Sequence, residues 1–73
     1  MNIRNLYRKL KDQSAIRQIE KIDGLVGMTV NERLFVSGLM NEFDKCVKHD
    51  KTRAKQILRW LKVDEPSIDK IVL

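Results

Sequence analysis

Apolar residues recur at helical spacing along most of the chain, which predicts a succession of short α-helices. A first apolar face contains Ile3, Leu6, Tyr7 and Leu10. A second face, on roughly the opposite side at 100° per residue, contains Ala15, Ile16, Ile19 and Ile22. We therefore predict a break near residues 12–14, where Asp12 or Ser14 would cap a new short helix. The alternative is one straight helix that lies between two layers or in a dimer.

The strongest local signal follows a flexible connector that contains Gly24 and Gly27. The run from Thr29 to Glu32 has the pattern of a capping box, in which the side chains of its first and last residues bond to each other's backbone amides. It predicts a dominant central helix over about residues 30–48. The apolar residues of that helix cover an arc of about 140° and would face the core. They are Phe35, Val36, Leu39, Met40, Phe43, Cys46 and Val47.

One apolar residue, Leu34, falls outside this arc. It lies among polar residues, with Gly38 one turn further along the helix. A glycine in that place would let another helix approach closely, either the first helix or a helix of another chain. We therefore list this side of the central helix as a candidate interaction site. Its residues are Arg33, Leu34, Gly38, Asn41 and Asp44.

Two further helices are predicted after the turn at His49-Asp50, with Asp50 as the cap of the third helix, about residues 51–62. Asp64 would cap the last helix, whose first turn accepts Pro66. The residues predicted to be buried in these helices are Ala54, Ile57, Leu58 and Leu61, then Ile68, Ile71 and Val72. A basic stripe lies beside the buried face of the third helix. Its members, with the neighbouring aromatic residue, are Lys51, Lys55, Arg59, Lys62 and Trp60.

These elements predict an all-α fold, a small bundle of four or five short helices in a single domain of 73 residues. Such a short chain buries a modest core, and the single cysteine, Cys46, allows no intramolecular disulfide. Stability must then come from helix packing or from self-association. The cysteine content favours a reducing compartment, and no apolar run is long enough for a transmembrane helix or a signal peptide. We expect a cytoplasmic protein that does not bind a membrane.

The net charge is +5, and the basic residues lie toward the two ends of the chain. Residues 1–27 and residues 51–73 each carry +3, whereas residues 28–50 carry −1. This layout permits an anionic partner. The basic stripe of the third helix, with Arg8 and Lys11 nearby, would contact phosphates non-specifically, although such stripes are more often solvated helix faces.

No set of residues in the sequence provides catalytic or metal-binding chemistry. Cys46 and His49 stand one helical turn apart, but a structural zinc site needs four ligands and the chain has no other Cys or His. Neither residue has a partner that would orient it as a nucleophile or a base, and no phosphate-binding motif is present. The spacing of Leu58 to Val72 matches a helix-turn-helix, but the would-be recognition helix starts with acidic residues. We predict a non-enzyme with no cofactor, no metal and no small-molecule substrate.

Residues 28–73 resemble a group of small uncharacterised bacterial proteins. The shared features are a run like Thr29 to Phe35, then Gly38-Leu39, then Phe43-Asp44, followed by a short helix pair near residues 57–65. In this motif, only Arg33 and Asp44 lack an evident packing or capping role. The resemblance implies a helical core module over residues 28–73. Residues 1–27 would then be an N-terminal helical extension or an upstream reading-frame segment.

The sequence favours a small helical protein that acts through protein–protein contact, as an accessory, antitoxin-like or immunity-type factor. The evidence is the missing chemistry, the small size and the apolar phase change in the first segment. Two alternatives stay open. One is a basic nucleic-acid-binding module that uses the third helix, and the other is a self-associating structural module.

Overall fold

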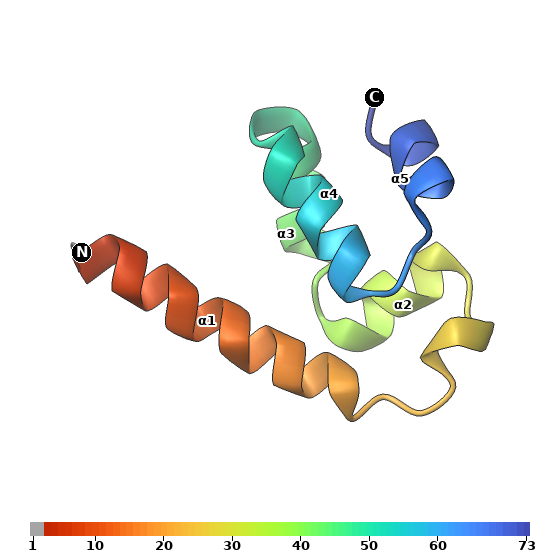
Figure 1. Cartoon of the computed structure of the whole chain (residues 1–73), viewed down its shortest axis with the longest axis horizontal. Coiled ribbons are helices and arrows are strands. Elements are labelled where there is room, and N and C mark those ends of the chain that lie inside the picture. Colours follow the sequence, from red (N-terminus) through yellow and green to blue (C-terminus); the bar gives the residue numbers. More distant parts are fainter. Residues whose placement is uncertain (1–2) are drawn as a thin grey trace.

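A computed structural model describes residues 3–73 and confirms an all-α fold, with five α-helices and no strand in that range (Figure 1). A short 3-10 turn, η1, separates the first two helices. The elements are α1 (Ile3–Glu20), η1 (Leu25–Gly27), α2 (Val30–Ser37), α3 (Met40–His49), α4 (Lys51–Trp60) and α5 (Glu65–Ile71).

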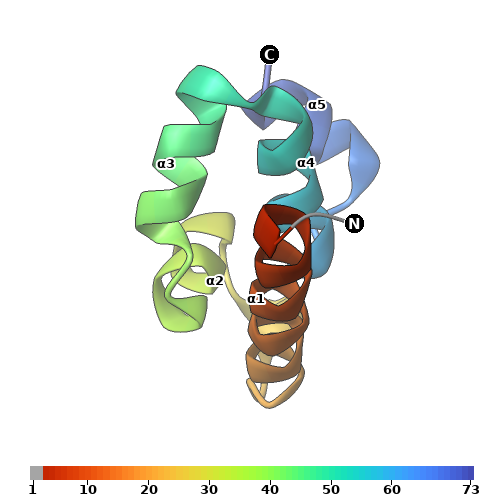
Figure 2. The same ribbon diagram turned by 90° about the vertical axis from the view of Figure 1, so that its left-hand side faces the viewer.

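Helices α2 to α5 form a compact unit, which we call the body, and α1 lies against one side of it and projects beyond it (Figure 1). In Figure 2, α1 lies in front, with α3 to one side of it. The molecule measures 38 × 29 × 19 Å, so it is elongated. The 18 residues of α1 span about 27 Å at 1.5 Å per residue. This helix is longer than the side of the body against which it lies, so one half of it projects into solvent.

The centre of the core is α4. The four residues predicted to be buried in the third helix are 0% exposed, and they are Ala54, Ile57 and Leu58 of α4 and Leu61 at its C-terminal cap. The other buried apolar residues come from every other helix and from the turns between them. They are Ile19, Leu25, Leu34, Leu39, Phe43, Cys46, Val63, Ile68 and Val72.

The three helix starts predicted at Thr29, Asp50 and Asp64 are confirmed. The Thr29 hydroxyl accepts the Glu32 amide at 3.2 Å, and the Glu32 carboxylate accepts the Thr29 amide at 3.1 Å. The side chains of Asp50 and Asp64 cap α4 and α5 by accepting amides three residues further on, each at 3.2 Å. These caps were predictable because each one involves residues only three positions apart.

The prediction of one central helix over residues 30–48 is wrong, because the chain forms two helices, α2 and α3. Gly38 adopts φ +76° and ends α2. The amides of Gly38 and Leu39 donate to the carbonyls of Phe35 and Leu34, both at 3.1 Å, which is the Schellman pattern. A Cβ at Gly38 would meet nothing within 4 Å, so this glycine provides a positive φ rather than room for another helix.

The turn at Gly38 also changes which side of α2 faces inward. Leu34, predicted to lie on the polar side, is 2% exposed and belongs to the core. Phe35 and Val36, predicted to be buried, are 78% and 46% exposed. The prediction placed all these side chains around one continuous helix through residue 48. Because α2 ends at Gly38 and α3 begins as a separate helix, the side chains of α2 point in different directions from those predicted. In α5, Ile71 is also more exposed than predicted, at 39%.

The predicted break near residues 12–14 is also wrong, because α1 is continuous from Ile3 to Glu20. No glycine or proline interrupts this segment, so the backbone hydrogen bonds have no reason to stop. The change of apolar phase is accommodated differently. Residues of the second face, such as Ile19, pack on the body, and the first face lies where no other element covers it. The helix is therefore continuous, as in the alternative interpretation, but no second layer covers its first face within residues 3–73.

Candidate functional site

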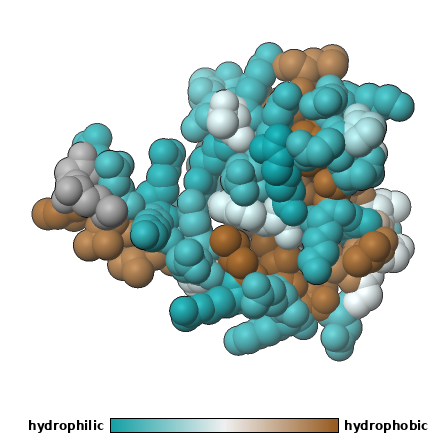
Figure 3. Space-filling model, in the orientation of Figure 1, coloured by the Kyte–Doolittle hydropathy of each residue, from teal (hydrophilic) through white to brown (hydrophobic). Residues whose placement is uncertain are grey.

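The projecting half of α1 carries an exposed apolar strip, which we define as Ile3, Leu6, Tyr7 and Leu10. These four side chains are 86%, 50%, 69% and 61% exposed, respectively. Figure 3 shows a hydrophobic band along the lower edge of the projecting helix and hydrophilic side chains along its upper side. Scattered apolar residues are normal on a protein surface, whereas a contiguous strip on one helix face is typical of an interaction site.

A salt-bridge cluster attaches the middle of α1 to the body. The guanidinium of Arg53 in α4 donates to Asp12 of α1 at 2.7 and 3.2 Å and to Glu42 of α3 at 2.8 and 3.2 Å. The Arg53 side chain is only 13% exposed and lies 5.6 Å from the centroid of the Trp60 ring. The two carboxylates raise the pKa of Arg53 further above its ordinary value, so the cation is always present. We call this cluster the Arg53 clasp.

A basic cleft of about 490 Å³ lies between the projecting half of α1 and the body. Three of its cations, Arg4, Arg8 and Lys11, come from α1, and Arg53 comes from α4. Within residues 3–73, no carboxylate lies within salt-bridge distance of the three α1 cations. The cleft therefore holds positive charge that the described part of the chain does not neutralise.

A more apolar groove of about 480 Å³ lies along α1 near the C-terminal end of α2. Tyr7, Leu10 and Ala15 contribute its apolar surface, and Ser37 closes it from α2. Tyr7 and Lys11 line both this groove and the basic cleft. The apolar strip thus lies next to two concave surfaces, the basic cleft and the apolar groove.

The structure divides the interaction site that we predicted around Leu34. Leu34 is buried and Gly38 forms the turn, so neither presents a surface to a partner. Asn41 and Asp44 are exposed on α3, but no side-chain hydrogen bond or pocket joins them to Arg33. The five residues therefore do not form one exposed face.

Arg33 has a structural role that the sequence did not reveal. Its guanidinium donates to the carbonyls of Val26 and Met28 at 2.9 and 3.0 Å, and to those of Leu61 and Lys62 at 3.1 Å. These carbonyls lie in the connector before α2 and at the C-terminal end of α4, where a cation also interacts favourably with the helix dipole. Arg33 therefore joins two turns that are far apart in the sequence.

The predicted basic stripe on α4 is partly neutralised by α5. Arg59 makes hydrogen bonds of 3.0 to 3.1 Å to the Glu65 carboxylate, and Lys55 lies 3.5 Å from Asp69. Trp60 is half-buried against the core, and it also lines a pocket to which Arg8 and Lys9 of α1 contribute. Lys51 and Lys62 stay exposed, and Lys62 occupies the end of α4 with φ +63°.

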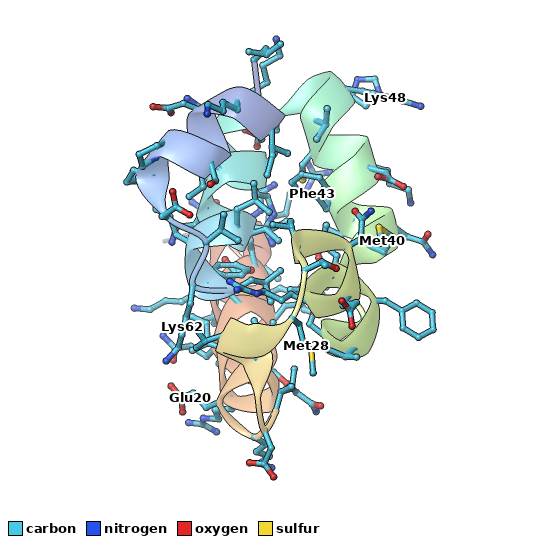
Figure 4. The ribbon with its side chains drawn as sticks, turned by 90° about the vertical axis from the view of Figure 1, so that its right-hand side faces the viewer. Glu20, Met28, Met40, Phe43, Lys48 and Lys62 are labelled. Carbon is cyan, nitrogen blue, oxygen red and sulfur yellow. The ribbon has the colours of Figure 1, made fainter. Side chains whose placement is uncertain are left out.

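A second exposed apolar patch lies on α2. Phe35 and Val36, with Met28 and Met40, line a shallow pocket of about 410 Å³ that Asn31 and Glu32 border. Figure 4 shows Met28 and Met40 on either side of α2, whereas Phe43 points into the space between helices. Glu32 is the only charged residue among those that line this pocket, whereas the cleft beside the strip on α1 is lined by Arg4, Arg8, Lys11 and Arg53.

Cys46 and His49 do not form a reactive pair. Cys46 is buried in the core, and this burial raises the pKa of its thiol, which makes the thiol less reactive. His49 is exposed at the end of α3. Among residues 3–73, no group of three or more His, Cys, Asp or Glu side chains is arranged to hold a metal ion.

Comparisons of the chain with family models, with curated proteins and with solved structures found no match. The resemblance of residues 28–73 to small bacterial proteins therefore stays a prediction. None of the helices within residues 3–73 combines the length and apolar character needed to cross a membrane.

Sequence reasoning missed the Arg53 clasp and the basic cleft. Asp12 and Arg53 are 41 positions apart, and no local pattern connects them. One feature of the sequence could have indicated the basic cleft, because residues 3–11 contain four basic and no acidic side chains. The same segment carries the apolar face of Ile3, Leu6, Tyr7 and Leu10, which the sequence reveals without showing that it is exposed.

Proposed function

We propose that this protein is a non-enzymatic interaction module that binds a protein partner through the projecting half of α1. The observation that carries the proposal is the apolar strip, held away from the core on a helix that the Arg53 clasp attaches to the body. Burying an exposed aliphatic or aromatic side chain yields roughly 1.5–3 kcal/mol, so four such side chains provide substantial binding energy. Accessory, antitoxin-like and immunity-type proteins all act by contact of this kind.

The state of the single cysteine and the groove beside the strip both agree with this proposal. Cys46 is a free, buried thiol in the core, which suits the reducing cytoplasm that we propose as its location. A partner helix that packs on the strip would also cover the apolar groove beside Tyr7. Contact with a partner would then bury the surface that the body leaves open.

Nucleic-acid binding through α4 ranks second. The salt bridges from Arg59 and Lys55 to α5 reduce the charge that α4 offers to phosphates. A gel shift with generic duplex DNA and RNA across about 50–300 mM salt tests this alternative, because phosphate contacts are strongest at low salt. No shift at the lowest salt would remove it.

The experiment for the main proposal is site-specific photo-crosslinking in cells that produce the protein. A photoreactive amino acid at Leu6 or Leu10 should give a discrete protein adduct. The same amino acid at Lys48, at the other end of α3 from the cleft (Figure 4), should give none. Absence of protein adducts at Leu6 and Leu10, or equal adducts at Lys48, would contradict the proposal.

A further inference from the structure

We infer that the partner presents an acidic amphipathic helix, which packs alongside the projecting half of α1. Its apolar side chains would cover the apolar strip, and its carboxylates would enter the basic cleft. This inference rests on the proposed function and specifies the chemistry of the partner surface.

The charge of the projecting segment is the first argument. Residues 3–11 carry four basic side chains and no acidic one. Three of them, Arg4, Arg8 and Lys11, fall within an arc of about 60° on α1, which begins next to the apolar strip and overlaps the side that faces the body. All three line the basic cleft. An amphipathic ligand on the strip would therefore meet positive charge along one edge.

The absence of counter-charges for these cations in residues 3–73 is the second argument. Three cations of α4 do have carboxylate partners, since Arg53 pairs with Asp12 and Glu42, Lys55 with Asp69, and Arg59 with Glu65. Glu42 is the one carboxylate among the lining residues of the cleft, and the Arg53 clasp already engages it. A carboxylate brought by a partner would provide the charge complementarity that the fold does not supply.

A second copy of the chain fits this surface poorly. Pairing two such helices would bring together eight basic side chains, four from each copy. Like charges at an interface oppose association.

The shape of the surface favours a helix over a bilayer or a nucleic acid. The strip lies beside the basic cleft of about 490 Å³ and the apolar groove of about 480 Å³, and the side chains of a helix can enter both concavities. A bilayer surface would not fill them. A nucleic acid would satisfy the cations but leave Ile3, Leu6 and Leu10 uncovered.

The test uses synthetic peptides and the full-length protein. One peptide is an amphipathic helix of Leu, Ala and Glu, the second has the same composition in scrambled order, and the third replaces every Glu by Lys. Fluorescence anisotropy should show saturable binding of the acidic amphipathic peptide only. Its affinity should fall at least several-fold when salt is raised from about 50 to 200 mM, because screening weakens the charge contacts.

Two variants locate the binding site. Arg8→Glu and Leu6→Glu should each weaken binding of the acidic peptide about tenfold or more. Lys48→Glu makes the same charge change as Arg8→Glu at an exposed position remote from the cleft, and it should alter affinity less than twofold. All three positions are exposed, and circular dichroism with thermal unfolding checks that each variant keeps the fold.

Several results would overturn the inference. Equal binding of the scrambled or the lysine peptide would remove the requirement for an acidic amphipathic helix. Binding to phosphatidylcholine–phosphatidylserine vesicles or to single-stranded RNA, without binding to the acidic peptide, would assign the surface to a different class of partner. If crosslinks at Leu6 still trap a protein but the acidic peptide does not bind, this inference fails and the proposed function stands. If both fail, the proposed function falls with it.

Discussion

The two halves of α1 belong to one continuous helix but have opposite surroundings. The C-terminal half packs Ile19 into the core, and Asp12 joins the Arg53 clasp. The N-terminal half has comparable apolar content, yet its strip is 50% to 86% exposed. The backbone hydrogen bonds of α1 continue beyond the half that packs on the body. The helix therefore extends into solvent although the apolar face of its N-terminal half is not packed. The body then contains the packed core, whereas the projecting half of α1 leaves its apolar strip exposed.

The largest contrast is expected from truncating an apolar side chain in each region. Leu58→Ala, in the fully buried centre of α4, should lower the free energy of unfolding by about 2–5 kcal/mol. Leu10→Ala, in the apolar strip, should change it by no more than about 0.5 kcal/mol. Urea unfolding followed by circular dichroism measures both. Similar losses for the two variants would mean that the strip contributes to the core.

The Arg53 clasp defines the border between the two regions, and breaking it should be the next largest effect. Arg53→Met keeps the aliphatic stem but leaves the Asp12 and Glu42 carboxylates without their cation, which should cost about 1–2 kcal/mol. Amide hydrogen exchange should accelerate first in α1. Lys55→Met, which breaks only the more exposed pair with Asp69, should cost under about 0.5 kcal/mol. Unchanged exchange in α1 would show that apolar packing alone attaches the helix.

The ends of α4 and α2 allow the body to be stabilised without touching α1. Lys62 holds φ +63°, a conformation that glycine adopts without strain, so Lys62→Gly should stabilise the protein by about 0.5–1 kcal/mol. Gly38→Ala, at φ +76°, should have the opposite sign and cost about 1 kcal/mol. Chemical unfolding gives both values. Hydrogen exchange of residues 3–11 should be the same in either variant, since these turns lie in the body.

The smallest effect is an acid sensitivity of the α2 cap. Hydrogen bonds from the backbone and side chain of Thr29 hold the pKa of Glu32 below its usual value of 4.5. The unfolded chain therefore takes up a proton first as the pH falls, so the cap contributes fully above about pH 4.5 and is lost as the pH drops through the folded pKa. Glu32→Gln should flatten the fall in melting temperature between about pH 5 and pH 3. Glu20→Gln, on the exposed end of α1, should leave that fall unchanged.

Local features of the fold were predictable because they depend on residues close in sequence. The Thr29–Glu32 box, the Asp50 and Asp64 caps and the buried face of α4 were all predicted and are all present. The candidate site was predicted less well. The apolar face of residues 3–10 was recognised in the sequence, but its exposure was not. The basic cleft needs α1, α3 and α4 to meet, which no local pattern indicates.

The sequence by itself determined that the chain is helical, where most helices begin, and that four basic residues and an apolar face share the segment before Asp12. Tertiary structure decided which faces are covered. It placed Leu34 inside and Phe35 outside by ending α2 at Gly38, and it paired Asp12 with Arg53 and Arg33 with the end of α4. The physical reason is the range of the interactions. Capping energies arise within one helical turn, whereas burial and ion pairing depend on residues that only folding brings together.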